Sequence, residues 1–349
     1  MKLKQQLEDF YVKEINDLQI KKKGEYCYLL VKKKNWTTLH LIDTLANRLR
    51  TDPARFQYAG LKDKDGITEQ VISGYKIDTE FLKNIKIKDV DITLLGFSDE
   101  PIKVGSHQGN EFTIIVRDLD HALNTENLQI PNYFDDQRFG GSIRPVSHLI
   151  GEAIVQENYE EAVRRCLCNP YPNESMENKK YRQKIEQLWP DLVTIVPPKN
   201  LFEEQRIIKS LQEEPENYQR AVISLPKRML LLYIHAYQSY LFNMRLAEYI
   251  EQQEKYIYSE YVLGKIPIPL QTIEEKNLPL IGMEINSLPQ CTIKTIQRAA
   301  VITGKNCQVS PLEKDEINQD KFKQTVTFSL PNGSYATIAI KTWYARSLA

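Results

Sequence analysis

The stretch YAGLKDKDGITEQ (58–70) forms a turn between two segments with β-strand character, FQYAG leading into it and TEQVISGYKI leaving it. The turn holds Asp63 between two lysines, and neighbouring cations favour the ionised form of a carboxylate. Ala59 and Gly60 allow the backbone to approach a partner or ligand closely. A solvated turn would explain this composition, but an ionised carboxylate can also be a nucleophile, a base or a metal ligand. The turn alone leaves these roles open.

Strand and helix patterns alternate on both sides of the turn. YCYLLV (26–31), DITLLGF (91–97) and NEFTIIVRDL (110–119) have the composition of strands. Two threonines after residue 36 can cap a helix with an apolar face, and Pro53 opens a shorter helix at its first position. The mixture predicts an α+β fold in which helices cover one face of a sheet. The apolar residues of the capped helix are Leu41, Ile42, Leu45 and Leu49.

Lysine triplets at 21–23 and 32–34 flank the first of these strands. Exposed lysines protect a sheet edge from pairing with another chain. The triplets therefore favour a solvated edge at this strand, and contact with phosphate groups is a compatible alternative.

Helical patterns dominate between residues 146 and 297. HLIGEAIVQENYEEAVRRCLC, KKYRQKIEQLW and a long segment at 226–253 are separated by segments that contain proline. Strand character returns after residue 297, where QTVTFSLPNGSYATIAIK (324–341) predicts a hairpin around its PNG turn. Such a strand pair could rejoin the first sheet, which would make the middle region an insertion.

The chain of 349 residues is long enough for two domains and a large core. Its hydrophobic content of 42% and charged content of 26% are ordinary for a soluble globular protein. Lysine and arginine together number 46, as do aspartate and glutamate, so the formal net charge is zero. Since nucleic-acid-binding proteins usually carry a basic excess, the overall charge counts mildly against RNA binding.

The cysteines are odd in number and scattered, which favours a reducing cytoplasm over a disulfide framework. The sequence has no apolar run of membrane-spanning length, and MKLKQQLEDFYVKEI (1–15) lacks the apolar core of a secretory signal. We therefore expect a cytoplasmic protein that keeps this segment. No second pair of ligands accompanies the two closely spaced cysteines, so no zinc site is expected. The cysteines are Cys27, Cys166, Cys168, Cys291 and Cys307.

A second unusual stretch is PNYFDDQRFGG (131–141), in which three aromatic residues stand among amide and charged side chains. Core segments rarely combine so many polar groups with aromatic rings. An aromatic ring beside an amide can stack on a nucleic-acid base and bind its edge. A polar turn with packed aromatic residues is the simpler alternative.

The two stretches together resemble the TruD family of tRNA pseudouridine synthases. The family's catalytic stretch, A-G-x-K-D-K/R followed by T-x-Q, is matched at 59–64 and 68–70, and its hallmark PNYF-x-x-QRFG at 131–140. The resemblance covers nearly the whole chain. Further matches in the family's order are EDFYVKEI at 8–15, GNEFTIIVR at 109–117, QSYLFN at 238–243 and LPNGSYATIAIK at 330–341.

This resemblance implies a catalytic α+β pseudouridine-synthase domain with a mixed or antiparallel sheet, formed by residues 1–145 and 298–349. A mainly helical α+β insertion, the family's TRUD domain, would then span 146–297. The implied reaction isomerises a uridine of tRNA, usually at position 13, without a cofactor or metal, and other RNAs stay open as substrates. Since that uridine lies within folded RNA, its base must be flipped into the site.

Matching the family's motifs also implies roles for single residues. Asp63 takes the place of the essential aspartate, either as a covalent nucleophile or as a base toward a sugar proton. Lys4 aligns with a lysine near that aspartate, where a cation keeps the carboxylate ionised and can balance charge on the uracil. Phe134 matches the aromatic residue that packs against the target base, and Asn132 matches the adjacent polar residue that helps to hold the site.

Four further residues are expected to contact RNA: Lys62, Lys64, Gln70 and Arg138. For the two lysines that flank Asp63, a role in the structure of the turn is the alternative, because neighbours in sequence need not point the same way.

Two other classes of function compete with an isomerase. One is an RNA-binding or chaperone protein that keeps the fold without chemistry, although it would have no need of Asp63. The other is a metal-dependent RNA nuclease using Asp63, Asp65 and Glu69, which would be inactivated by chelation. The sequence shows no evident stripe of residues that would form an interface between subunits, and this favours a monomer.

Overall fold

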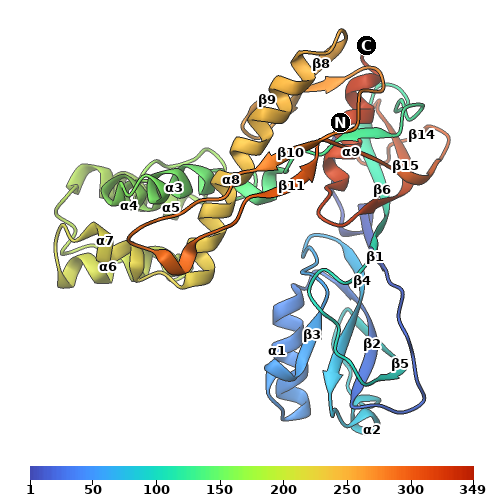
Figure 1. Cartoon of the computed structure of the whole chain (residues 1–349), viewed down its shortest axis with the longest axis horizontal. Helices are drawn as coiled ribbons and strands as arrows, with labels where there is room; N and C mark the ends of the chain where they lie inside the picture. The colour runs from blue at the N-terminus through green and yellow to red at the C-terminus, as the bar shows by residue number, and fades with distance from the viewer. The chain divides into compact units, whose positions relative to one another are not determined.

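The structure, a computed structural model, describes all 349 residues and divides into two compact units. The first unit comprises residues 1–130 and 302–349, and the second comprises residues 131–301. The chain passes between the units at β7 (Gln129–Pro131) and at β12 (Val301–Thr303). The first unit is therefore discontinuous in the sequence (Figure 1).

A mixed sheet of nine strands forms the centre of the first unit. Its main path runs β13-β15-β6-β1-β4-β2-β5, while β14 pairs with β15 and β3 pairs with β4. β1 and β4 are parallel, and the other neighbours on the path are antiparallel. This sheet, with its helices, confirms the expected α+β class. The strands are β1 (Phe10–Ile15), β2 (Tyr26–Lys34), β3 (Phe56–Tyr58), β4 (Ile67–Tyr75), β5 (Val90–Ser98), β6 (Gly109–Leu119), β13 (Lys305–Val309), β14 (Glu313–Lys314) and β15 (Phe322–Pro331).

The apolar face of β2 packs against α1 (Thr38–Leu49). Leu29 and Val31 of the strand share a buried cluster with Leu41 and Leu45 of the helix. The side chain of Thr37 accepts a hydrogen bond from the N–H of the third residue after it, which confirms the expected helix cap. The other helical segments of this unit are η1 (Leu7–Asp9), η2 (Pro53–Arg55), α2 (Thr79–Leu82) and α9 (Ala336–Arg346).

The solvated edge predicted from the lysine triplets is wrong for β2. This strand lies between β4 and β5 and includes the second triplet. Because side chains alternate along a strand, Lys32 is exposed while Lys33 is buried on the face that carries Leu29 and Val31.

The hairpin predicted at 324–341 is only half correct. Its first run forms β15, which pairs with β6 and so rejoins the main sheet. Its second run begins α9, in which Ala336, Ala339, Ile340 and Trp343 are buried at helical spacing. The ring of Trp343 packs edge-on against Phe328 of β15 at 4.8 Å between centroids. The short alternation in ATIAI mimics a strand, and the apolar residues that follow it continue the helical period.

The second unit is built around α8 (Lys227–Glu251), its longest helix. Figure 1 shows the other helices of this unit gathered along the first part of α8, with β8 and β9 near its end. Buried residues of α8 share one core with those helices. The remaining elements are η3 (Asp136–Phe139), α3 (Ser147–Val155), α4 (Tyr159–Leu167), α5 (Met176–Leu188), α6 (Phe202–Glu213), α7 (Tyr218–Ile223), β8 (Tyr256–Tyr261), β9 (Gly264–Pro269), β10 (Asn277–Leu280), η4 (Pro289–Cys291) and β11 (Ile296–Ala299).

The second unit begins before the predicted insertion, at residue 131 rather than 146. The reason is the packing of the PNYF stretch, which bonds to elements of the second unit. The backbone of Phe134 pairs with the side chain of Asn243 in α8, and Asn132 bonds to Ala299 in β11. Structural compactness therefore groups this stretch with the helices that follow it.

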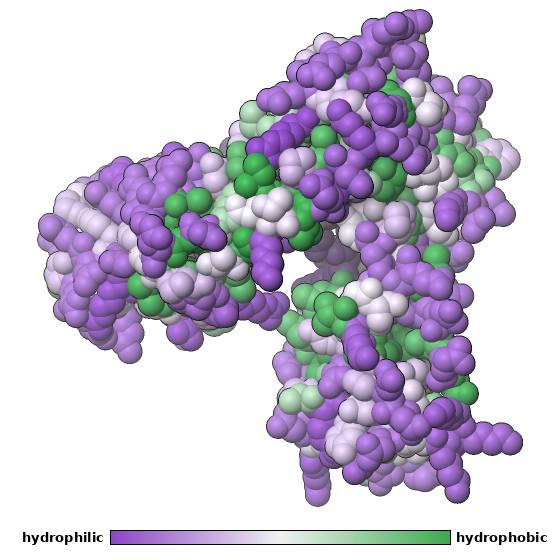
Figure 2. All heavy atoms as spheres, viewed as in Figure 1, coloured by the Kyte–Doolittle hydropathy of each residue, from purple (hydrophilic) through white to green (hydrophobic).

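The visible face of the protein is mainly hydrophilic, with apolar residues in small scattered groups (Figure 2). None of its helices combines the length and the apolar character needed to cross a membrane.

Candidate active site

The loop that carries Asp63 connects β3 to β4, and buried side chains hold its backbone. The hydroxyl of Thr38 accepts a hydrogen bond from the N–H of Lys62 at 3.1 Å. The amide of Gln70 donates to the carbonyl of Gly60 at 3.3 Å and accepts from the Thr38 hydroxyl at 2.8 Å. The conformation of the loop is therefore fixed by the first turn of α1 and by β4.

Lys4 and Asp63 form an ion pair, although 58 residues separate them in the sequence. The Nζ of Lys4 lies 2.9 Å from the Oδ2 of Asp63 and 4.1 Å from the centroid of the Phe10 ring. The two charged side chains are 27% and 28% exposed, so the pair is partly shielded but open to solvent on one side. The structure thus joins Lys4 to Asp63, as the family resemblance implied.

Lys4 is placed by main-chain bonds on both sides of it. The backbone of Lys2 pairs with that of Arg117 in β6, and the N–H of Gln6 donates to the carboxylate of Asp9 at 2.9 Å. Lys4 itself adopts a φ of 56°, in the left-handed region that non-glycine residues seldom occupy. These anchors hold a strained backbone that directs the ammonium toward Asp63.

Two of the predicted RNA contacts are buried. The Nζ of Lys62 lies 2.9 Å from the carboxylate of Glu14 and donates to the side chain of Asn110 at 2.7 Å. The side chain of Lys62 is 7% exposed, and Gln70 is fully buried. Both side chains are engaged within the protein, where they hold the loop and its surroundings, and their contact with RNA stays a prediction.

The remaining polar residues of the opening stretch differ in exposure. Lys64 and Asp65 are exposed, so contact of Lys64 with RNA stays a prediction. Glu69 accepts a hydrogen bond from the hydroxyl of Tyr11 at 2.9 Å, and burial together with this bond raises the pKa of Tyr11 to about 12. No group of three or more His, Cys, Asp and Glu side chains is arranged to hold a metal ion, so the nuclease hypothesis gains no geometric support.

The sequence analysis missed Lys33, which is 1% exposed. Its Nζ donates to the carbonyl of Trp36 at 2.5 Å and to the carbonyl of Asp63 at 3.1 Å. Burial lowers the pKa of the Lys33 ammonium to about 8, while the negative charge of Asp63 opposes that shift and the positive charge of Lys62 adds to it.

Lys33→Met is expected to change how stability depends on pH. Between pH 8 and the usual lysine pKa of 10.5, Lys33 binds fewer protons in the folded protein than in the unfolded chain. The free energy of unfolding rises with pH in such a window. The free energy of unfolding of the wild type should therefore increase relative to that of the variant between pH 8 and 10. Urea unfolding of both proteins across this range measures the difference. A constant difference would contradict the burial effect, and Lys32→Met, at an exposed neighbour, is the matched control.

A second group of predicted residues lies in the second unit. Arg298 of β11 donates to the backbone carbonyl of Asn132 at 3.0 Å and to its side-chain oxygen at 2.6 Å. The amide nitrogen of Asn132 donates to the carbonyl of Ala299 at 3.0 Å. The guanidinium of Arg298 also lies 4.1 Å from the centroid of the Phe134 ring. Asn132 and Phe134 are thus linked by one arginine that the sequence analysis did not identify.

The backbone of Phe134 is held by α8. Asn243 accepts from its N–H and donates to its carbonyl, both at 2.9 Å, and the hydroxyl of Tyr261 donates to the same carbonyl. The Phe134 ring packs edge-on against Phe242 at 5.7 Å, and the guanidinium of Arg138 lies 5.3 Å from its centroid. Asn243 ends the QSYLFN motif, which is the one sequence signal that marked it.

Asn243→Ala is expected to destabilise the protein by about 2–3 kcal/mol, because the N–H of Phe134 loses its partner in a buried place and its carbonyl loses one of two donors. The midpoint of urea unfolding, followed by circular dichroism, measures the loss. Met244→Ala, at an exposed position of the same helix, should leave the midpoint almost unchanged. Equal midpoints for Asn243→Ala and the wild type would show that Asn243 does not anchor the stretch.

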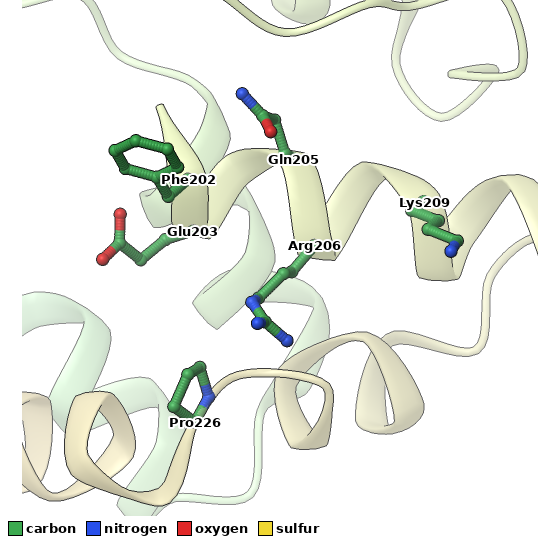
Figure 3. Close-up of a pocket in the computed structure, with 6 residues that line it drawn as sticks. All are labelled: Phe202, Glu203, Gln205, Arg206, Lys209 and Pro226. Atoms are coloured by element: carbon green, nitrogen blue, oxygen red, sulfur yellow. The ribbon is translucent and has the colours of Figure 1, made fainter. Parts of the chain in front are cut away.

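A hollow of about 640 Å³ lies between α6 and the start of α8 (Figure 3). It combines the exposed ring of Phe202 with two cations and one carboxylate, so its charge is mixed. It contains none of the residues predicted for the site. Its lining residues are Phe202, Glu203, Gln205, Arg206, Lys209 and Pro226.

Comparison with known proteins gives one consistent family. The model of the family described as tRNA pseudouridine synthase D (TruD) matches residues 1–266. "Probable tRNA pseudouridine synthase D" of Methanococcoides burtonii is 29% identical, over 98% of this chain and 92% of its own. "tRNA pseudouridine synthase D" of Aquifex aeolicus is 28% identical, over 98% of this chain and 97% of its own. A TruD crystal structure from Methanosarcina mazei has a TM-score of 0.72 at 27% identity and covers 98% of this chain and 93% of its own.

The mixed sheet, its helices and these matches define the class of the protein as an RNA-modifying isomerase of the pseudouridine synthase type. Since the family model spans more than half of its residues, the chain belongs to the TruD family of tRNA pseudouridine synthases.

Proposed function

We propose that this protein isomerises the uridine at position 13 of tRNA to pseudouridine and that Asp63 is its catalytic carboxylate. The observation that supports this most directly is the ion pair of Lys4 and Asp63 on a rigidly held loop, in a chain of the TruD family. In the reaction the N1–C1′ bond of uridine breaks, the base turns, and a C5–C1′ bond forms. C5 loses a proton and N1 gains one, so no atom is added or removed overall.

In this proposal Asp63 acts on the nucleoside as a nucleophile or as a base. Lys4 pairs with the carboxylate before the reaction and supplies a positive charge as negative charge develops on the detached uracil. The exposed fraction of each side chain, 27% and 28%, supports access of a flipped nucleoside to the pair.

Phe134 is the proposed packing partner of the target base, and Asn132 helps to hold it. The clamp of Asn243 on the Phe134 backbone and the cations of Arg138 and Arg298 beside the ring support this role. Phe134 is 6% exposed, so a base would reach its face only after a neighbouring side chain moves. We assign that movement to Arg138, which is half-buried and belongs to the short helix η3.

We further propose that residues 146–297 form the family's insertion domain, that tRNA is the principal partner, and that the enzyme is a monomer that acts in the cytoplasm. Five free cysteines without a disulfide are consistent with a reducing compartment.

The proposal is tested by incubating the purified protein with an unmodified tRNA transcript that has uridine at position 13. Carbodiimide labelling and reverse transcription should then give a new stop at that position. A stop at another uridine would overturn the assigned target. Binding of the transcript without any new stop would favour the non-catalytic RNA-binding alternative.

A further inference from the structure

Lys33 occupies the last buried position on the apolar face of β2. Hydrogen-bonded strands fix its backbone on both sides, since it is paired with Thr68 of β4 and with Val90 of β5. Leu29 and Val31 precede it on the same face, beneath α1. The aliphatic part of Lys33 therefore extends the core, and its ammonium leaves the core beside the loop that carries Asp63.

The bonds that the Lys33 ammonium donates bring two loops together. One goes to the carbonyl of Trp36, just before α1, and the other goes to the carbonyl of Asp63. Burying an ammonium is unfavourable unless its hydrogens are well bonded. An apolar side chain would fill the same place beside Leu29 and Val31 at a lower cost in free energy. A lysine at this position is thus better explained by what it holds than by what it contributes to the core.

Holding the carbonyl of Asp63 constrains the carboxylate of the same residue. The carbonyl lies in the plane of the peptide that follows the Asp63 Cα, so holding the carbonyl restricts rotation about the Cα–C bond and thereby the directions that the Cα–Cβ bond can take. The carboxylate then meets the Nζ of Lys4 at 2.9 Å. Asp63 is therefore held at both ends, by Lys33 through its main chain and by Lys4 through its side chain.

We propose that Lys33 is a positioning residue for catalysis, which fixes the carboxylate of Asp63 by clamping its carbonyl. This inference rests on the proposed role of Asp63 and deepens it. Lys33 is buried and touches no substrate, so it should affect the rate of the bound reaction and leave the affinity for tRNA unchanged. A role in RNA contact would have the opposite signature, as expected for an exposed lysine of the same triplet.

The test compares Lys33→Met with Lys32→Met. Both variants remove one positive charge from β2, but only the first removes the clamp, because Lys32 is exposed. We expect kcat for pseudouridine formation to fall at least about tenfold in Lys33→Met, since small displacements of a reacting group are costly, while the Kd for tRNA stays unchanged. Lys32→Met should keep the kcat of the wild type. Circular dichroism and thermal unfolding establish the folded fraction of each variant.

Three results would overturn the inference: an unchanged kcat in Lys33→Met, a loss of kcat that matches a loss of folded protein, or an equal loss in Lys32→Met. An inactive wild type would instead refute the proposed function itself, so the two failures are distinguishable. If Lys33→Met does not fold, the inference is tested with Lys33→Ala, whose kcat is measured with added ethylamine and with added ethanol. Recovery of kcat with ethylamine but not with ethanol supports the clamp, and no recovery in folded protein overturns it.

Discussion

Asp63→Asn is expected to abolish detectable pseudouridine formation, with a loss in kcat of about 10⁴-fold, at the upper end of what a positioned acid or base contributes. Asparagine has the shape of aspartate, and its side-chain oxygen can still accept the hydrogen bond that Lys4 donates to Asp63 at 2.9 Å. The amide, however, is neither a nucleophile nor a base at neutral pH, whichever of the two roles the carboxylate performs. Because the loop is held by Thr38, Gln70 and Lys33, the fold and the affinity for tRNA should survive the change.

The matched control is Asp65→Asn, two residues along the same loop. Asp65 is exposed, and its replacement should leave kcat and KM near those of the wild type. Single-turnover assays with saturating enzyme measure the chemical step, and a filter-binding assay measures the Kd for tRNA. Substantial activity in Asp63→Asn, or a comparable loss in Asp65→Asn, would remove Asp63 from the centre of the mechanism.

Lys4→Met should be the next most damaging change, with kcat reduced by about 100-fold or more. The variant removes the ammonium that pairs with Asp63 and keeps an unbranched side chain against the Phe10 ring. The charge that develops on the detached uracil would then lack a nearby cation. Stability should change little, because ion pairs open to solvent on one side contribute at most about 1 kcal/mol.

Lys2→Met is the control for charge at this end of the chain. Lys2 is 51% exposed, and its Nζ lies 3.9 Å from Asp118, so its charge should not affect kcat. Lys4→Arg should recover part of the rate by restoring the positive charge. Full activity in Lys4→Met at neutral pH would show that the ion pair with Asp63 is incidental to catalysis.

Much of the fold followed from local patterns in the sequence. The strand at 26–31 extends to Lys34 in β2, and the helix capped at Thr37 is α1. The second half of the 324–341 segment was misassigned, because alternation over a few residues fits a strand and a buried helix equally well. What distinguishes them is the partner surface, here Phe328 beneath Trp343.

The candidate site shows a different limit of prediction from the sequence. Composition drew attention to the lysines on either side of Asp63, yet the structure pairs Lys62 with Glu14 and leaves Lys64 exposed. The cation that meets Asp63 is Lys4, which the family resemblance had indicated. Sequence neighbours of Asp63 share its loop, but the direction of each side chain depends on the backbone of that loop.

The partners that join residues through long-range bonds could not be identified from local patterns, although Asn243 lies in the QSYLFN motif. Arg298 bonds to Asn132 across 166 residues of sequence, and Asn243 bonds to Phe134 across 109. Lys33 looked like part of a solvated triplet, since one sequence does not reveal that its strand lies inside a sheet. These contacts depend on topology, which periodicity and composition do not determine.

The position of β15 in the main sheet has a consequence for how the chain is made. β15 is the partner of β6 on one side, but the ribosome synthesises it some two hundred residues after β6, once the whole second unit has emerged. The second unit is continuous and can complete its own contacts during translation, whereas β6 must wait with one side unpaired. An unpaired strand is a template for aggregation. Nascent chains stalled before residue 322 should therefore depend strongly on chaperones.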